Sequence, residues 1–221
     1  MFIASLADPA LGFARRPASA GRAPRHVDPG ETQAVAECFM SAPTRAGALV
    51  ARAYRELQAQ TDRQFAALTD PRGPYRIAVV GTRVTVPYSG AGELIDSVLA
   101  TRTLEITPPD RAHPLLGGEA GGAYCRLRAV HDLIGHVATG YGFDRDGEYS
   151  AWLAQRGCYT GLARWAAATE LHGEVSALWA TGQFAEHKAA LLDRDLLSRR
   201  GGSATGGGGG NAPGAEACRA A

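Results

Sequence analysis

The sequence predicts an α+β fold, dominated by helices and organised as one domain with a small strand pair in its N-terminal third. Two observations lead to this expectation. Apolar residues recur at helical spacing through residues 43–69 and through most of residues 123–197. Short runs of β-branched residues occur around residues 77–86. The candidate site residues lie in the later part of this pattern, so a functional site is expected among the later helices.

The two ends of the chain differ in composition from its middle. Residues 1–30 are rich in Ala, Arg and Pro, and residues 201–221 form a Gly-rich tail. Neither end can bury a core, so both are expected to be disordered. Residues 31–200 are long enough for one sizeable core. We therefore expect a single domain between a disordered leader and a disordered tail.

The elements of this domain can be placed in order. Residues 43–69 form an amphipathic helix, ended by a Pro- and Gly-containing turn. Residues 77–80 and 83–86 flank Gly81-Thr82 and predict a hairpin or a bent strand pair. We then expect a helix near residues 92–101, a strand at 104–106 and a loop at 108–122. From there to about residue 197 the chain is expected to be helical, except for a turn at 140–147.

Composition excludes several partners. The formal net charge is +1 and basic residues are scattered, so no nucleic-acid surface is expected. No apolar run approaches the roughly 18 residues of a membrane span, and the first 20 residues do not read as a secretory signal. The 4 cysteines lie far apart without a C-x-x-C pair, for which reduced thiols are the default. These observations predict a cytoplasmic protein that contacts neither membrane nor nucleic acid.

Two histidines lie five residues apart, beside an acid and a glycine. On a straight α-helix His131 and His136 would point about 140° away from one another. They can share one ion if the helix widens to π geometry, at roughly 4.4 residues per turn, or loosens at Gly135, where distortion costs least. A single histidine on an apolar stripe is more often a core residue. Two of them with an adjacent acid and glycine favour a metal site.

Three downstream glutamates are candidates for a third ligand. Glu170 is preferred because it lies in the alanine-rich stretch 166–170 of a helix expected to be buried, where a carboxylate needs a partner. Glu148 is also explained as an acid in the first turn of a helix. Glu174 lies one turn beyond Glu170 and would share its face. The predicted triad joins the two histidines to Glu170, and the other two glutamates stay open as alternatives.

The ligand types bear on the metal and on the roles of nearby residues. Two histidines and one carboxylate favour Fe(II), because three positions remain for oxygen and substrate, and zinc is the alternative. Asp132 lies too close to His131 to share the ion. Asp132 or Glu174 is therefore expected to serve in catalysis by orienting a histidine or a bound water. Other side chains are expected to shape the pocket or the core around it: Tyr141, Trp152, Trp165 and His172.

The segment 131–137, His-Asp-Leu-Ile-Gly-His-Val, resembles the H-E-L-L-G-H-V segment of the pterin-dependent aromatic amino acid hydroxylases. In that family both histidines bind iron, and a glutamate further along the chain completes the triad. Thr169-Glu170 resembles the site of that glutamate, with Glu170 34 residues after His136. The resemblance implies hydroxylation of an amino acid or a derivative. Pterin is not expected, because the longer catalytic domain of that family does not fit between residues 31 and 200.

A wider resemblance spans about residues 48–193. It rests on an ordered set of blocks: Val86–Ser89, Glu93–Asp96, His113–Leu116, Arg128–His136, Gly142–Glu148, Thr169–Glu174 and Phe184–Leu192. This set is similar to a family of uncharacterised proteins with an H-D-x-x-G-H motif, found in actinobacteria and in polyvalent proteins of phages and conjugative elements. The resemblance brings no established activity. Members read T-E-T-R-G-Q where this chain has Thr169-Glu170-Leu171-His172-Gly173-Glu174.

These patterns predict a metal-binding, catalytic-like domain, of the non-haem Fe(II) oxygenase type, that acts on a small molecule. A zinc-dependent hydrolase is the alternative, with Glu148 or Glu174 as general base to a metal-bound water. A third hypothesis is a non-catalytic module of a mobile element, whose ion ties helices together. A closed shell of four ligands, with His172 as a candidate, would favour that third hypothesis.

Overall fold

The computed structural model describes residues 23–43 and 46–198, and helices dominate this part of the chain, as predicted. Two strands and eight α-helices occur in it, in the order α3 Pro29–Ser41, α4 Ala48–Thr69, β1 Ala78–Gly81, α5 Ala91–Thr101, β2 Thr103–Ile106, α6 Ala123–His131, α7 Arg145–Gln155, α8 Gly161–Ala168, α9 Glu174–Thr181 and α10 Arg194–Ser198. Two π-helical segments lie between them, Asp132–Val137 after α6 and Thr169–Gly173 between α8 and α9.

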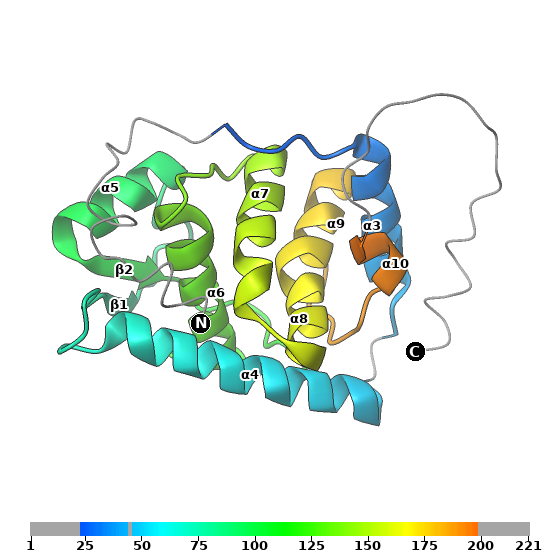
Figure 1. Ribbon diagram of the computed structural model, residues 1–221, viewed down its shortest axis with the longest axis horizontal. Helices are drawn as coiled ribbons and strands as arrows, with labels where there is room; N and C mark the ends of the chain where they lie inside the picture. The colour runs from blue at the N-terminus through cyan, green and yellow to red at the C-terminus, as the bar shows by residue number, and fades with distance from the viewer. Residues whose placement is uncertain (1–22, 44–45, 199–221) are drawn as a thin grey trace.

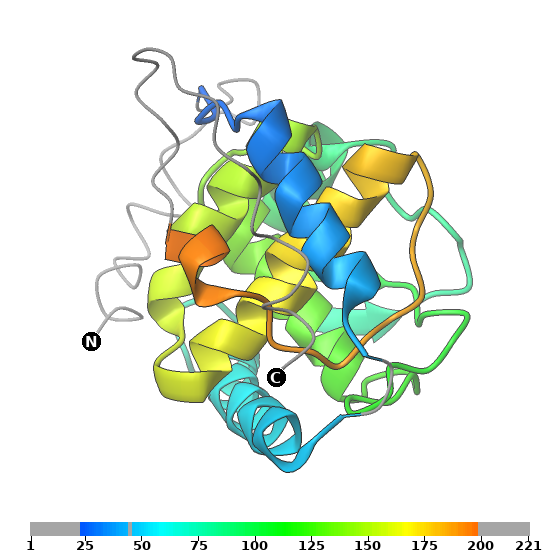
Figure 2. The same cartoon turned by 90° about the vertical axis from the view of Figure 1, so that its right-hand side faces the viewer.

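Several helices lie side by side in one row, and α4 crosses one end of this row. Figure 1 shows α6, α7, α9 and α3 side by side, with α4 lying across one end of them. The strands and α5 form one end of the molecule, and α10 lies beside α3 at the other. Turning the molecule shows α3 packed along α9 (Figure 2). The chain segments that carry the conspicuous histidines and glutamates therefore lie in the middle of the row.

Helix α4 holds the row together, and its pattern explains how. Its buried positions recur every three or four residues and face α6 and α8. They are Val50, Ala53, Tyr54, Leu57, Thr61, Gln64 and Leu68. The helix ends at Thr69, just before Asp70 and Pro71, because the residue before a proline is restricted against helical backbone. The helix predicted at residues 43–69 is confirmed from Ala48 onward.

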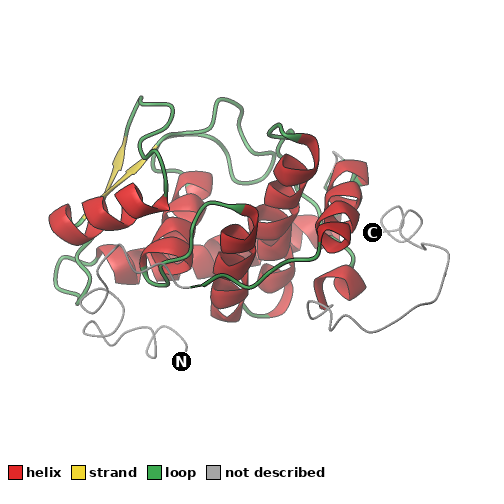
Figure 3. Ribbon diagram, turned by 90° about the horizontal axis from the view of Figure 1, so that it is seen from above, coloured by secondary structure: helices red, strands yellow, loops and turns green. Residues whose placement is uncertain are grey.

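The strand pair differs from the predicted hairpin. Strand β1 pairs in parallel with β2, with Val79 opposite Leu104, and α5 makes the connection between them. The second predicted strand, 83–86, is not a strand, and the side chains of Val84 and Val86 are exposed. Parallel strands need a crossover, whereas a hairpin needs a tight turn. The strand expected at 104–106 is the true partner, and Figure 3 shows both strands at one end of the molecule.

Part of the expected leader is ordered. Val27 is buried, and the backbone N–H of Arg25 donates to Ser150 Oγ at 2.6 Å. Asp28 caps α3 by accepting from the backbone N–H groups of Gly30 and Glu31. Helix α3, which no sequence pattern predicted, packs against α9. The boundary of the leader at residue 30 is therefore too late. The predictions for residues 1–22 and 201–221 lie outside the described residues.

Two other sequence expectations can be compared with the described residues. Cys125 and Cys158 are free thiols, as expected. Cys38 is disulfide-bonded, so the expectation of reduced thiols is wrong for this cysteine. In the ranges 23–43 and 46–198, no helix combines the length and hydropathy that a membrane span needs.

Candidate metal centre

The two histidines meet because the helix between them widens. His131 is the last residue of α6, and His136 lies in the π-helical segment that follows. The backbone N–H of Ala138 donates to the Leu133 carbonyl, five residues back, at 2.9 Å. This spacing brings His131 Nε2 and His136 Nε2 to 3.2 Å, with the two rings nearly perpendicular. The π geometry predicted from the five-residue spacing is confirmed.

Gly135 is required here for space. A Cβ on Gly135 would lie 3.0 Å from His131 Nδ1 and 3.2 Å from Ala151 Cβ of α7. Both separations are tighter than ordinary van der Waals contact, so a side chain would push the His131 ring and α7 away. The sequence pointed to Gly135 as the place where the helix could loosen. The structure adds that the glycine lets the widened turn approach α7.

Glu148 completes the group from the first turn of α7. Its Oε2 lies 3.3 Å from His131 Nε2 and 3.5 Å from His136 Nε2. The start of α7 is fixed by Asp144, whose side chain accepts from the backbone N–H of Gly147 at 2.9 Å. Gly147 in turn packs directly on the backbone of Gly142. The turn that begins α7 therefore aims Glu148 at the two rings.

The hydrogen bonds behind the rings leave their Nε2 atoms as acceptors. His136 Nδ1 lies 3.0 Å from the Tyr141 carbonyl, which can only accept, so Nδ1 carries the proton. His131 Nδ1 lies 2.7 Å from Gln155 Oε1, an amide oxygen that also accepts. When both rings are neutral, these contacts leave two Nε2 lone pairs and a carboxylate facing one another. A positive ion among them would relieve this repulsion.

The spacing of the three atoms fits a metal ion. At a bond length of about 2.1 Å, ligand atoms lie about 3.0 Å apart around an octahedral ion and about 3.4 Å apart around a tetrahedral one. The separations of 3.2 and 3.3 Å fall within this range, and the third, 3.5 Å, lies just above it. Among the described residues, His131, His136 and Glu148 are the group of His, Cys, Asp or Glu that could hold a metal. The structure thus places a candidate metal site among the later helices, as predicted.

The electrostatics of the group also favour a cation. Burial raises the pKa of the Glu148 carboxyl, but its contacts with His131 and His136 outweigh burial and lower the pKa to about 2. Burial lowers the pKa of His131, while the hydrogen bond and the charge of Glu148 raise it above its ordinary value. The carboxylate therefore stays ionised, and a positive charge beside it is stabilised, either as a proton on His131 or as a divalent cation that takes the place of that proton.

The glutamate that lies beside the two histidines is Glu148, whereas the third ligand expected from the sequence was Glu170. Glu170 is buried, as predicted, but it lies in another cluster: the Tyr54 hydroxyl donates to its Oε1, and His113 Nε2 lies 3.3 Å from the same oxygen. His113 Nδ1 accepts from two backbone N–H groups, so Nε2 carries the proton and faces the carboxylate. Glu170 therefore has the Tyr54 hydroxyl as a hydrogen-bond donor and the His113 ring within 3.3 Å in place of a metal, which satisfies its need for a partner.

The two residues expected to assist catalysis also lie apart. Glu174 Oε1 is 3.0 Å from His187 Nδ1 and belongs to the same cluster as Glu170. Asp132 lies at the start of the π-helical segment, next to the triad, and burial raises its pKa above the ordinary value although Arg128, His131 and His136 act to lower it. Of the two, only Asp132 is placed where its charge acts on both histidines of the triad.

The aromatic residues and His172 mostly belong to the core. His172 packs on Tyr149 and Trp152, and burial lowers its pKa to about 4. Trp165 donates its indole N–H to the Leu192 carbonyl. Tyr141 contributes its backbone carbonyl to His136. A further aromatic ring, Phe143, stands edge-on to His136 with 4.8 Å between ring centroids.

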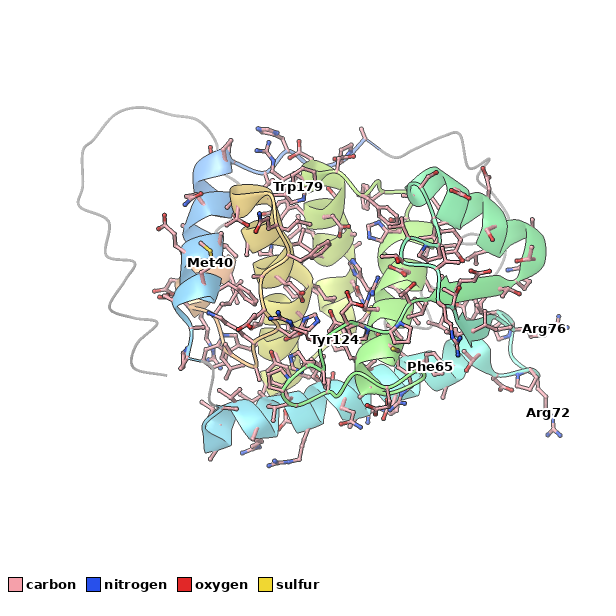
Figure 4. All side chains as sticks on the ribbon, turned by 180° about the vertical axis from the view of Figure 1, so that it is seen from behind. Met40, Phe65, Arg72, Arg76, Tyr124 and Trp179 are labelled. Atoms are coloured by element: carbon pink, nitrogen blue, oxygen red, sulfur yellow. The ribbon has the colours of Figure 1, made fainter. Side chains whose placement is uncertain are left out.

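Several residues of both clusters escaped the sequence analysis. At the triad these residues are Gln155 and Phe143. Around Glu170 and Glu174 they are Tyr54, His113, Tyr124 and His187, of which Tyr54 and His113 come from distant parts of the chain. Figure 4 labels Tyr124, which lies near the middle of the molecule. Tyr54 lies 116 residues from Glu170, so local spacing carries no signal for that contact. The one available signal was the Asp144–Glu148 turn, where Glu148 could have been ranked higher.

The pair formed by His187 and Glu174 predicts a pH dependence of stability. The hydrogen bond and charge of Glu174 raise the pKa of His187, and burial opposes them. Stability from this pair is fully present below about pH 6.5, the ordinary pKa, and is lost as pH rises through the higher folded-state pKa. We expect wild type to exceed His187→Gln in free energy of unfolding by about 1 kcal/mol near pH 6. Denaturant unfolding from pH 6 to 9 measures this difference, and a constant difference would contradict the assignment.

Comparisons with protein-family models, with curated proteins and with solved structures found no match. The family resemblances drawn from the sequence motifs therefore stay predictions. What this chain does must be argued from the geometry of the candidate site.

Proposed function

We propose that the protein is a metal-dependent enzyme of the non-haem oxygenase type, in which His131, His136 and Glu148 hold Fe(II). The observation that carries this proposal is the convergence of three acceptor atoms, 3.2 to 3.5 Å apart, without a fourth ligand from the described His, Cys, Asp and Glu residues. Three protein ligands leave coordination positions for exchangeable molecules, whereas structural metal sites are usually closed by four.

Each residue of the site has a defined task in this proposal. The bound metal would supply oxygen activation, for which two histidines and one carboxylate are a suitable ligand set. Both imidazoles are held from behind through Nδ1, so their Nε2 atoms keep a fixed direction. The Phe143 ring shields one side of His136. Asp132 places a further carboxylate beside the triad, where it can orient a histidine or a water molecule.

The proposed substrate is a small molecule, such as an amino acid or a derivative. This part of the proposal rests on the His-Asp-Leu-Ile-Gly-His-Val segment and its resemblance to the amino acid hydroxylases. With Glu148 in the triad, the third ligand follows His136 by 12 residues, a shorter interval than the one that supported the resemblance at Glu170. The ligand set is therefore a stronger support for the proposal than the spacing.

The alternatives receive less support from the same contacts. A zinc hydrolase needs a general base beside the metal-bound water. Of the two carboxylates considered for that role, Glu148 lies against the two histidines as a member of the triad, and Glu174 pairs with His187. A closed structural site would need His172, which instead packs on Tyr149 and Trp152. Asp132 is the acid that a hydrolase mechanism would have to use.

Single substitutions of the histidines test the proposal. We expect His131→Ala and His136→Ala each to lose stoichiometric Fe(II) while keeping most of their helical content, because one ligand of three is removed from a preformed site. Anaerobic purification, elemental analysis and circular dichroism measure both properties. His187→Gln, a histidine outside the triad, should keep its metal. Full occupancy in either alanine variant would refute the shared site.

The identity of the metal is tested separately. Iron-loaded wild type should bind nitric oxide and give a high-spin paramagnetic signal, since the three ligands leave open positions. The opposite result has two parts: protein from its native host carries only zinc, and the iron-loaded form neither binds nitric oxide nor consumes oxygen. That result would favour the hydrolase over the oxygenase.

A further inference from the structure

The His131 ring is held from both sides by one helix. Helix α7 presents Glu148 to Nε2 from its first turn and Gln155 to Nδ1 from its last residue. Gln155 follows Glu148 by seven positions, which on an α-helix corresponds to about two turns and about 10 Å. The two side chains therefore lie on nearly the same face of α7. The ring of His131 therefore lies in the space between these two side chains.

Gln155 has no access to solvent, with 0% of its surface exposed. A buried amide is unfavourable unless it is hydrogen-bonded, so its position needs a specific reason. Its Oε1 lies 2.7 Å from His131 Nδ1, the shortest of the contacts that the two triad imidazoles make with their surroundings. This contact provides a partner for the amide oxygen of Gln155, and the Tyr159 hydroxyl is a second polar group beside the same side chain.

The packing around the ring makes its orientation depend on that contact. Gly135 and Ala151 both lack long side chains, which lets the ring fit between the π-helical segment and α7. Small residues define the space but not the direction of the ring nitrogens. An acceptor at Nδ1 is what keeps the proton there and leaves the Nε2 lone pair free for a ligand bond.

We propose that Gln155 is the positioning residue of the metal centre: it fixes the tautomer and the direction of His131 so that Nε2 faces the ion. This inference rests on the proposed function, since it presumes that the triad binds a metal. As a neutral amide, Gln155 polarises the imidazole less than a carboxylate would. Its removal should therefore weaken metal binding, and its replacement by a carboxylate should strengthen it.

Cobalt(II) titration of the metal-free protein tests the inference, because the visible spectrum of bound cobalt reports the geometry of its ligands. Gln155→Leu keeps a side chain of similar size without an acceptor, and we expect a 10- to 100-fold loss of affinity, on the order found for outer partners of metal ligands. Gln155→Glu should bind at least as tightly as wild type. The spectrum of Gln155→Leu should change, which a merely structural role would not produce.

Gln64 provides a matched control. It is a second buried glutamine, in α4, whose Nε2 donates to the Cys158 carbonyl at 3.1 Å and which makes no contact with the triad. Gln64→Leu should lower thermal stability without changing cobalt affinity. Should Gln155→Leu fail to fold, Gln155→Glu still decides, because weaker binding by that variant at unchanged thermal stability would overturn the inference.

The outcomes separate the inference from the proposed function. If wild type binds no cobalt, both the proposed metal centre and this inference are refuted. Wild type that binds cobalt, with Gln155→Leu equal to it in affinity and spectrum, would overturn only the role of Gln155. Equal losses in Gln155→Leu and Gln155→Glu would likewise contradict the role, because the carboxylate retains an acceptor for His131 Nδ1.

Discussion

Glu148→Gln is expected to abolish tight Fe(II) binding, whereas Glu170→Gln should leave it unchanged. The first substitution removes the negative ligand that lies 3.3 and 3.5 Å from the two imidazoles. We expect its affinity to fall by more than about 100-fold, since loss of an outer partner alone costs about 10- to 100-fold. Isothermal titration or equilibrium dialysis under anaerobic conditions measures both variants.

Glu170→Gln acts as the matched control, because it makes the same chemical change in the other buried cluster. The amide oxygen can still accept from Tyr54 and His113, but the charged acceptor is lost. We expect a loss of about 1–3 kcal/mol in the free energy of unfolding and no change in metal affinity. The reverse pattern, metal loss in Glu170→Gln and retention in Glu148→Gln, would restore the triad first expected from the sequence.

Gly147→Ala is expected to be the most disruptive small substitution near the site. A Cβ there would lie 2.3 Å from the Gly142 carbonyl oxygen and 2.9 Å from its nitrogen, and backbone atoms cannot move aside as a flexible side chain can. Overpacking of this kind typically costs about 1–3 kcal/mol. Since Glu148 follows directly, the displaced turn should also lose the metal. Denaturant unfolding and metal titration measure the two effects.

Gly92→Ala is the control for the glycine substitution. Gly92 lies in α5, and a Cβ there would meet nothing within 4 Å. Alanine at such a helical position should stabilise the protein by up to about 1 kcal/mol, because it reduces the freedom of the unfolded chain. If Gly147→Ala were as stable as wild type with its metal retained, the close approach to Gly142 would not be what aims Glu148.

The sequence determined the features of this protein that depend on local spacing. The periodicity of α4 predicted its buried face, because an apolar stripe of that period can be buried only as a helix. The interval between His131 and His136 predicted that the helix must widen to a π turn or loosen at Gly135 if the two rings were to meet, and a π-helical turn is present. Glu170 among alanines required a buried partner, which the structure provides in Tyr54 and His113.

Only the tertiary structure decided which groups become partners. The local sequence made both Glu148 and Glu170 candidates for the third ligand. Which of them reaches the two histidines depends on how α7 lies against the π-helical segment. Glu170 finds Tyr54, 116 residues away, because α4 crosses the row of helices. Strand β1 pairs with β2 because α5 returns the chain alongside it. Contacts between distant segments follow from packing the whole core, and neither periodicity nor spacing within one segment encodes them.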